Sequence, residues 1–317
     1  MDGETKKIEV AMIGAGPSAL AAAVYTSREH IETVLFEKGV IGGLAAITDK
    51  VDNYPGFDEG VEGMELAMKL QNQAERFGAK IELAEVSNIS KNDDGSILLE
   101  TSSGNYEAQA ALIATGSDYK RIGVPGEEEY YGRGVHYCAT CDGAFYKDKK
   151  LVVVGGGNSA AQESLFLTRF ASEIIVLVRS DWSASEVLVD EVEAHEKITV
   201  MKGVTTDEIL AGDDKKVAKV IGTNKESGDK VEIETDGVFI FVGLKPNTEF
   251  LADTDIKLDE IGFVKAESDL MTTIEGVFVS GDVRSGATMQ IASAVGEGAT
   301  AALKIREYLE ERERSKS

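Results

Sequence analysis

Residues 8–19, IEVAMIGAGPSA, decide the fold of this chain. The apolar run 8–13 has the composition of a buried parallel strand, and the glycine-rich turn after it leads into a helical pattern through about Arg28. Residues 33–37, TVLFE, then predict a second strand that ends in an acid. A strand, a G-x-G-x-x-A turn, a helix and a second strand make up the βαβ unit that binds dinucleotides.

The same series returns in the middle of the chain. Residues 151–154, LVVV, predict a strand that leads into the turn GGGNSA at 155–160, a helix to about Phe170 and a strand over 174–178. Two copies in matching contexts support nucleotide binding far better than one glycine-rich turn does. We therefore predict an α/β protein with two Rossmann-like three-layer nucleotide-binding domains, the second inserted into the first.

The two βαβ units differ at the end of their second strands. In each unit, the first glycine permits the tight bend, the second lets the backbone approach a pyrophosphate, and the helix N-terminus faces the phosphates. Glu37 ends the second strand of the first unit, where an acid accepts a ribose hydroxyl, whereas Val178 and Arg179 stand at the matching place in the other unit. The first site is therefore expected to hold a nucleotide with a free ribose diol, such as the AMP half of FAD.

Two more short apolar runs end in glycine. They are ALIATG at 111–116 and GVFVSGD at 276–282, and the second precedes a glycine-punctuated helical stretch from Gln290 to about Leu309. Together with the first βαβ unit, these runs predict a nucleotide domain that an insertion interrupts.

The composition excludes some classes of protein. With 56 acidic and 33 basic residues the formal net charge is −23, which repels phosphate backbones, so we expect no nucleic-acid partner. Lys6 and Lys7 precede an uncharged run from Val10 to Ser27 that superficially resembles a membrane span or signal peptide. The glycines and proline of the turn interrupt this run, and the pattern recurs mid-chain. We therefore expect a cytoplasmic protein without a membrane partner.

The chain has two cysteines, Cys138 and Cys141, in a Cys-x-x-Cys motif. Two thiols are too few for a disulfide scaffold, so the motif indicates redox catalysis or half of a metal site. Zinc needs about four ligands, and the histidines at 30, 136 and 195 would have to converge from distant positions. We predict a redox pair and no metal.

With these motifs in hand, the chain closely resembles the low-molecular-weight thioredoxin reductases over nearly its full length. Cys-Ala-Thr-Cys-Asp just before the second Rossmann unit is the most specific part of the resemblance. The other matching segments are the two glycine-rich turns, Gly42–Leu44, Asn53–Gly56, Ala114–Gly116, Val242–Gly243, Pro246–Asn247, Gly281–Asp282 and Gln290–Ala292.

The resemblance implies an FAD domain built from residues 1–117 and 247–317 around a pyridine-nucleotide domain at 118–246 that carries the cysteine pair. It also implies a homodimer in which one domain rotates against the other on linkers near Ser117–Arg121 and Leu244–Thr248. Such rotation would expose the dithiol alternately to flavin and to thioredoxin or a thioredoxin-like protein.

The resemblance also transfers binding residues. The expected FAD residues are Gly14, Gly16, Pro17, Ser18, Glu37, Lys38, Gly43, Leu44, Asn53, Ala114, Thr115, Gly116, Gly281, Asp282, Gln290 and Ile291. The expected residues for a nicotinamide nucleotide are Gly155, Gly157, Asn158, Ser159, Ala160 and Arg179. The family often has an arginine before the glutamine at 290, where this chain has Met289.

By resemblance, Cys141 is the flavin-proximal sulfur, Cys138 attacks the partner disulfide, and Asp142 is the acid/base that protonates the leaving thiolate. The alternative for Asp142 is a helix N-terminal acid that the dipole favours. A Cys-x-x-Cys at a helix start commonly lowers a thiol pKa from about 8.5 to roughly 7. We expect His136 to be a near-surface polar residue outside the site.

The electron donor stays open. NADPH-using members carry a His-Arg-Arg cluster and a further arginine after the second Rossmann strand, whereas VRSDWSA at 178–184 keeps only Arg179. Losing two charge-assisted hydrogen bonds costs about 3–6 kcal/mol, or about two to four decades of affinity, and Asp181 adds like-charge repulsion. Three candidate donors remain: NADPH held through Arg179 and Ser180, NADH, or a non-pyridine donor such as reduced ferredoxin or a deazaflavin. The intact second turn favours a nicotinamide nucleotide.

Three other functions remain as alternatives. A dithiol oxidase would use the same cysteines and pass electrons from flavin to oxygen. A peroxide-linked reductase normally carries an extra N-terminal thioredoxin-like region, whereas this sequence starts at its FAD strand. A flavin-binding redox sensor would not need Cys138, Cys141 and Asp142 together.

Overall fold

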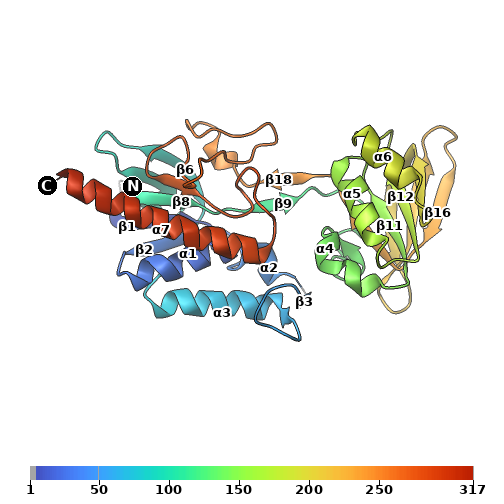
Figure 1. Ribbon diagram of the computed structural model, residues 1–317, viewed down its shortest axis with the longest axis horizontal. Coiled ribbons are helices and arrows are strands. Elements are labelled where there is room, and N and C mark those ends of the chain that lie inside the picture. Colours follow the sequence, from blue (N-terminus) through green and yellow to red (C-terminus); the bar gives the residue numbers. More distant parts are fainter. Residues whose placement is uncertain (1–4, 49, 317) are drawn as a thin grey trace. The chain divides into compact units, whose positions relative to one another are not determined.

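The computed structural model describes residues 5–48 and 50–316. The chain divides into two compact units: unit 1 comprises Met1–Asp118 and Lys245–Ser317, and unit 2 comprises Tyr119–Leu244 (Figure 1). Two short strands, β9 (Ser117–Tyr119) and β18 (Leu244–Pro246), carry the chain out of unit 1 and back, and they pair with each other. Unit 2 is therefore an insertion in unit 1.

Unit 1 is built on a seven-stranded sheet in the order β5-β2-β1-β8-β7-β6, with β19 also paired to β8. Its parallel strands are β5 (Lys80–Leu83), β2 (Thr33–Glu37), β1 (Lys6–Ile13), β8 (Gly104–Ile113) and β19 (Val277–Val279). β7 (Ile97–Thr101) and β6 (Val86–Lys91) continue the sheet antiparallel. The central strands are apolar in both side-chain directions because a parallel sheet is covered on both faces.

Helices α1 (Pro17–Arg28), α3 (Gly63–Arg76) and α7 (Ile291–Lys316) cover one face of this sheet (Figure 1). Pro17 opens α1, where its missing N–H costs no hydrogen bond. Helix α7 approaches α1 so closely that a Cβ on Gly298 would lie 2.1 Å from the carbonyl oxygen of Ser18. The start of α1, directly after the first glycine-rich turn, is therefore packed against the C-terminal helix.

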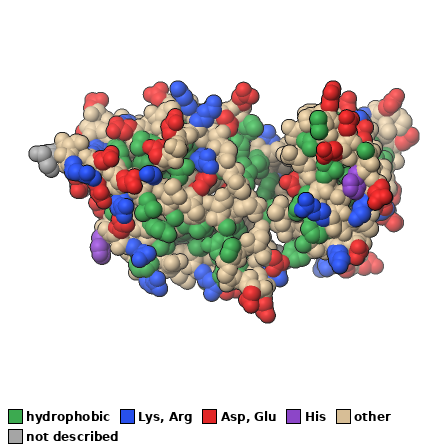
Figure 2. Space-filling view, in the orientation of Figure 1, with side chains coloured by type: hydrophobic (Ala, Val, Ile, Leu, Met, Phe, Trp, Pro, Cys, Tyr) green, Lys and Arg blue, Asp and Glu red, His purple; other side chains and the backbone are tan. Residues whose placement is uncertain are grey.

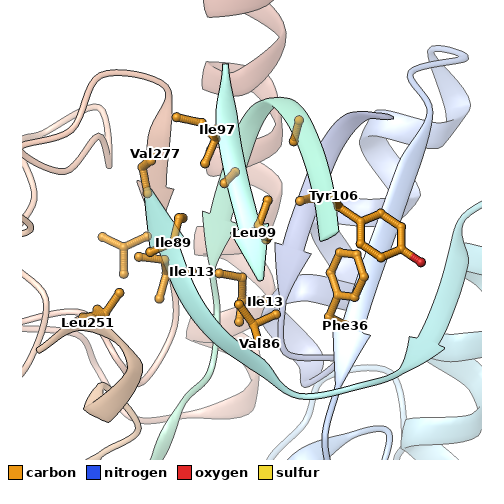
Figure 3. Close-up of a cluster of buried hydrophobic side chains, with 14 of the residues drawn as sticks. Ile13, Phe36, Val86, Ile89, Ile97, Leu99, Tyr106, Ile113, Leu251 and Val277 are labelled. Carbon is orange, nitrogen blue, oxygen red and sulfur yellow. The ribbon is translucent and has the colours of Figure 1, made fainter. Parts of the chain in front are cut away.

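A cluster of buried apolar side chains covers the opposite face of the sheet (Figure 3). Ile89 and Leu99 from the antiparallel strands meet Ile13 of β1 there. The rings of Phe36 and Tyr106 pack edge to face with centroids 4.7 Å apart. The remaining short elements of unit 1 are α2 (Gly43–Ala46), β3 (Lys50–Val51), β4 (Val61–Glu62) and the 3₁₀ helix η2 (Glu249–Leu251).

Unit 2 repeats the plan on a smaller scale. Its parallel sheet has the order β10 (Val135–His136), β17 (Gly237–Ile240), β11 (Lys150–Val154), β12 (Glu173–Val178) and β13 (Ile198–Lys202). The helices are α4 (Ala139–Asp142), the 3₁₀ helix η1 (Gly143–Tyr146), α5 (Asn158–Leu167) and α6 (Glu186–Glu193). An antiparallel sheet of β14 (Val204–Ala211), β15 (Val217–Asn224) and β16 (Lys230–Glu234) completes the unit.

The C-terminal helix is longer than the sequence pattern predicts, since α7 continues beyond Leu309 to Lys316. Arg312 explains the extension, because its guanidinium donates to the carbonyl oxygens of residues 94 and 95 in the turn between β6 and β7 and of residue 109 on β8. Conversely, α5 ends at Leu167 rather than near Phe170, where the chain turns.

Acidic side chains are spread over the visible face of each unit (Figure 2), in keeping with the net charge of −23. Along the described residues, 5–48 and 50–316, no helix combines the length and the apolar character needed to span a bilayer.

Candidate functional site

The cysteine pair lies at the start of α4 in unit 2. Cys138 and Cys141 are joined by a disulfide, and both are partly exposed. Cys138 is the N-cap of the helix, and its Sγ accepts a hydrogen bond from the backbone N–H of Cys141 at 3.2 Å. An N–H group aimed at this sulfur stabilises a thiolate there once the disulfide is reduced.

Asp142 comes directly after the pair and contacts a buried histidine. Its Oδ2 lies 3.2 Å from Nδ1 of His136, and Nε2 of the same ring lies 2.6 Å from the hydroxyl of Tyr146. His136 is only 7% exposed, because β10 pairs with β17 and the helix η1 brings Tyr146 over it. The prediction that His136 lies near the surface is therefore wrong, and its ring contacts Asp142.

A second polar cluster holds the residue before the pair. The hydroxyl of Tyr137 donates to buried Glu127 at 2.7 Å, and this carboxylate also accepts the backbone N–H groups of Ile122 and Gly123. Burial and the hydrogen bond to Glu127 raise the pKa of Tyr137. Tyr119, at the end of the connecting strand β9, stacks on the same ring. The cysteine pair is thus tied to the first connecting segment.

In unit 1, the first glycine-rich turn requires glycine at its bend. Gly14 has φ +102°, and a Cβ there would lie 2.5 Å from the carbonyl oxygen of Ala114. A Cβ on Gly16, in contrast, would meet nothing within 4 Å, so its backbone faces open space. Glu37 accepts the backbone N–H groups of Ala15 at 2.8 Å and Gly39 at 2.7 Å. This carboxylate keeps lone pairs for a ribose hydroxyl.

Asp282 carries an unsatisfied acceptor at the end of β19. Its Oδ1 is buried without a hydrogen-bond partner among the described residues. Burial, with a smaller contribution from Glu297, raises the pKa of Asp282 to about 6. Glu297 itself pairs with Arg284 and accepts the backbone N–H of Gly281 at 3.0 Å. The sequence reasoning missed Glu297 and Arg284. The only signal of Glu297 is a charge within a run of small helical residues, and Arg284, in the loop between β19 and α7, has no such signal.

These groups fit FAD. A buried orphan acceptor at Asp282 suits the hydroxyl groups of a ribityl chain, because an unpaired buried polar atom costs free energy until a donor reaches it. The open backbone at Gly16, at the N-terminus of α1, suits a pyrophosphate.

The other predicted residues of unit 1 surround this turn in part. Gly42, next to Gly43 and Leu44 of α2, donates its N–H to the carbonyl oxygen of Ala15. Asn53 donates to Gln290 at 3.0 Å, and Thr115 bonds the backbone of Asn247. Ser18 shares a hydrogen bond with Ser280. Two expected residues make no such contact: Lys38 pairs with exposed Glu85, and Ile291 packs in a separate apolar cluster.

The raised pKa of Asp282 makes the stability of the FAD-free protein depend on pH. Because the folded value, about 6, lies above the ordinary value of 3.8, the stabilisation is complete below pH 3.8 and is lost as the pH rises through about 6. Asp282→Asn cannot ionise, so at pH 7.5 the FAD-free variant should be more stable than the native protein by on the order of 2 kcal/mol. The same variant should bind FAD more weakly, because an amide is a poorer acceptor than a carboxylate.

Urea denaturation of FAD-depleted protein at pH 4.5 and pH 7.5 measures the first effect, and flavin fluorescence titration measures the second. Asp58→Asn, at an exposed aspartate, is the matched control and should change neither quantity. Equal stability of Asp282→Asn and the native protein at pH 7.5 would contradict the assignment.

The second glycine-rich turn in unit 2 is held by the loop after β12. A Cβ on Gly155 would lie 2.4 Å from the carbonyl oxygen of Phe241, so this position also needs glycine. Asn158 accepts the N–H of Ser185 at 2.8 Å, and the carbonyl oxygen of Gly156 accepts the N–H of Ser183 at 2.7 Å. Of the remaining predicted residues here, Gly157 is the N-cap of α5, and Ser159 and buried Ala160 lie in its first turn.

Cationic side chains gather at the end of β12. Arg179 makes no hydrogen bond or ion pair within the described chain, and Lys225 reaches Ser180 Oγ at 3.4 Å. Asp181 Oδ1 lies 3.6 Å from Nζ of Lys202, so its charge is partly balanced. Lys225 comes from the segment after β15 and has no sequence signal that would link it to this strand.

Comparison with known proteins agrees with this geometry. Residues 8–298 match the pyridine nucleotide-disulphide oxidoreductase family. A thioredoxin reductase of Bacillus subtilis is 40% identical over 97% of this chain and 96% of that protein. A 34.2 kDa protein in the rubredoxin operon of Clostridium pasteurianum is 35% identical over 96% of this chain and 98% of that protein. The crystal structure of a thioredoxin reductase from Streptococcus pyogenes MGAS5005 superposes with a TM-score of 0.92 at 38% identity, covering 97% of this chain and 100% of that one.

The prediction of two nucleotide-binding α/β domains, the second inserted into the first, is thereby confirmed. The chain belongs to the pyridine nucleotide-disulphide oxidoreductase family, in which it is a thioredoxin reductase-like disulfide reductase with Cys138 and Cys141 as its redox pair.

Proposed function

We propose that this protein reduces the disulfide of thioredoxin or a thioredoxin-like protein, with FAD bound in unit 1. The observation that carries the proposal is the partly exposed Cys138–Cys141 disulfide with an N–H group directed at Cys138 Sγ. The thioredoxin reductases that the chain resembles support the choice of partner. The resemblance also supports a homodimer, and thiol chemistry of this kind suits the cytoplasm.

Glu37, the open backbone at Gly16 and the orphan acceptor of Asp282 would hold FAD. When bound and reduced by the donor, FAD would supply the two electrons that reduce the Cys138–Cys141 disulfide. Cys138 passes its proton to Asp142 as its sulfur attacks the partner disulfide, and the N–H of Cys141 stabilises the thiolate that forms. The departing partner sulfur takes a proton from Asp142. Cys141 then attacks Cys138 Sγ, which releases the second partner thiol and restores the disulfide.

We propose a nicotinamide nucleotide, NADPH or NADH, as the donor to the flavin. The second βαβ turn is complete, and the cationic groups of Arg179 and Lys225 stand where β12 ends. A lysine from a distant segment would offset part of the charge that the missing arginines remove.

A non-pyridine donor, reduced ferredoxin or a deazaflavin, is the second candidate. One observation favours it: Ser183 and Ser185 bond to Gly156 and Asn158, so the loop after β12 lies against the turn that a dinucleotide would approach. A relative named for its place in a rubredoxin operon is consistent with a one-electron carrier as donor.

Anaerobic mixing with each donor tests this choice. We expect NADPH or NADH at about millimolar concentration to bleach the flavin absorbance, and added oxidised thioredoxin to restore it. If neither nucleotide bleaches the flavin while reduced ferredoxin or a reduced deazaflavin does, the nicotinamide proposal is wrong. Oxygen consumption with a small dithiol, without thioredoxin reduction, would identify a dithiol oxidase instead.

A further inference from the structure

We propose that His136 is a positioning residue that fixes the orientation of the Asp142 carboxylate next to the cysteine pair, through a hydrogen-bond chain from Tyr146 to His136 to Asp142. The inference rests on the proposed acid/base role of Asp142 and adds a residue through which that role is controlled.

The chain of contacts uses both ring nitrogens of His136. Nε2 lies 2.6 Å from the hydroxyl of Tyr146, and Nδ1 lies 3.2 Å from Oδ2 of Asp142. The ring of Phe239 stacks on the imidazole with centroids 5.1 Å apart. With 7% exposure, the histidine has little access to water that would replace either partner. Its position is therefore determined by β10, β17 and η1 together.

The direction of the hydrogen bonds is set by the carboxylate. An ionised carboxyl group only accepts hydrogen bonds, so the Nδ1 atom that contacts Asp142 carries the hydrogen and donates it. In a neutral imidazole Nε2 is then the acceptor. Burial, Asp142 and Asp236 raise the pKa of Tyr146, so the phenol keeps its proton and donates it to Nε2. The carboxylate of Asp142 is thereby held in one orientation.

The surroundings of Asp142 leave this histidine as its closest stabilising partner in the described residues. Burial and the charge of Asp142 raise the pKa of Tyr131, which stays neutral, and Arg121 lies over the ring of Tyr131 at 5.4 Å from its centroid. Asp236 is engaged by Lys149 and by the backbone N–H of Lys150.

A carboxylate held in this orientation accepts the proton of the Cys138 thiol as that sulfur attacks the partner disulfide. It returns this proton to the sulfur that leaves the partner, so no net proton is gained or lost by Asp142 in the exchange. Without the N–H of His136, the carboxylate loses the partner that orients it, and proton transfer to and from the sulfurs becomes slower.

The test is a single-turnover pH profile of the holoenzyme. FAD-bound protein is reduced with dithionite, which avoids any dependence on the natural donor, and is mixed with oxidised thioredoxin between about pH 5 and pH 9. His136→Leu should slow the reaction about tenfold throughout this pH range, because the carboxylate is no longer held next to the sulfurs. His136→Asn retains an N–H near the place of Nδ1 and should restore most of the native profile. His195→Asn is the matched control and should leave the profile unchanged.

Histidine NMR gives a readout that does not depend on activity. The chain has three histidines, so the His136 signals are assigned by comparison with His136→Asn. We expect protonated Nδ1 and bare Nε2 in the native protein, and a change of tautomer in Tyr146→Phe. This second variant keeps the inference testable should His136→Leu fail to fold.

The outcomes separate the inference from the proposed function. If Asp142→Asn slows the reaction but His136→Leu keeps the native profile, the inference about His136 is overturned and the role of Asp142 stands. If Asp142→Asn keeps the native profile, both are overturned. A native histidine protonated on Nε2 also contradicts the inference.

Discussion

A Cys141→Ser variant is expected to bind FAD normally and to accept electrons from the donor, yet to reduce thioredoxin slower than the native protein by about three orders of magnitude or more. The groups proposed to hold FAD, Glu37 and Asp282, belong to unit 1, whereas Cys141 belongs to unit 2, so the substitution leaves these groups in place. Without the second sulfur, the flavin has no disulfide to reduce, and a mixed disulfide at Cys138 has no internal thiol to resolve it.

Steady-state thioredoxin reduction and anaerobic flavin titration measure the two halves of this prediction. Non-reducing electrophoresis should show a stable adduct between Cys138 and a thioredoxin substrate in Cys141→Ser, and no adduct in Cys138→Ser. Thr140→Ala changes an exposed residue between the cysteines and should retain turnover. Full activity of Cys141→Ser would refute the assigned relay.

A Gly298→Ala substitution is expected to destabilise unit 1 by about 3 kcal/mol or more. The added Cβ would lie 2.1 Å from the carbonyl oxygen of Ser18, and backbone at the start of α1 cannot move aside as a flexible side chain does. Because that segment comes directly after the phosphate turn, FAD affinity should fall along with stability.

Gly296→Ala is the matched control, two residues earlier in the same helix. A Cβ there meets nothing within 4 Å, so alanine should stabilise the helix by about 0.5–1 kcal/mol. Urea denaturation, monitored by the rise in fluorescence of the released flavin, compares the unfolding midpoints of the two variants at equal m-value. Equal midpoints for both variants would mean that α1 and α7 do not approach as closely as the structure indicates.

Much of the fold could be predicted because its signals are local. The strand β2 and the helix α1 begin and end where the sequence pattern predicts, since a buried parallel strand, a glycine turn and a helix each depend on neighbouring residues. The end of α7 could not be predicted in this way. Its last turns depend on Arg312, which reaches carbonyl groups of the β6–β7 turn and of β8, far away in the sequence.

The residues of the candidate site also fall into those that local sequence predicts and those that it does not. Cys138, Cys141 and the two glycine-rich turns are visible in the sequence, because close spacing along the chain is what their chemistry requires. Residues that act across the fold cannot be found in this way: the sequence gives no sign that His136 is buried beside Tyr146, or that Glu297 pairs with Arg284. Such pairs depend on strand order and on which helix covers which face.

By itself, the sequence determined that this chain has two dinucleotide-type βαβ units and a vicinal cysteine pair, because both are written in short, contiguous patterns of residues. Only the tertiary structure decided that His136 contacts both Asp142 and Tyr146. It also decided that, among the described residues, Asp282 is left with an unpaired buried oxygen. The physical reason is that burial and hydrogen-bond partners are properties of packed elements, and no local run of residues contains them.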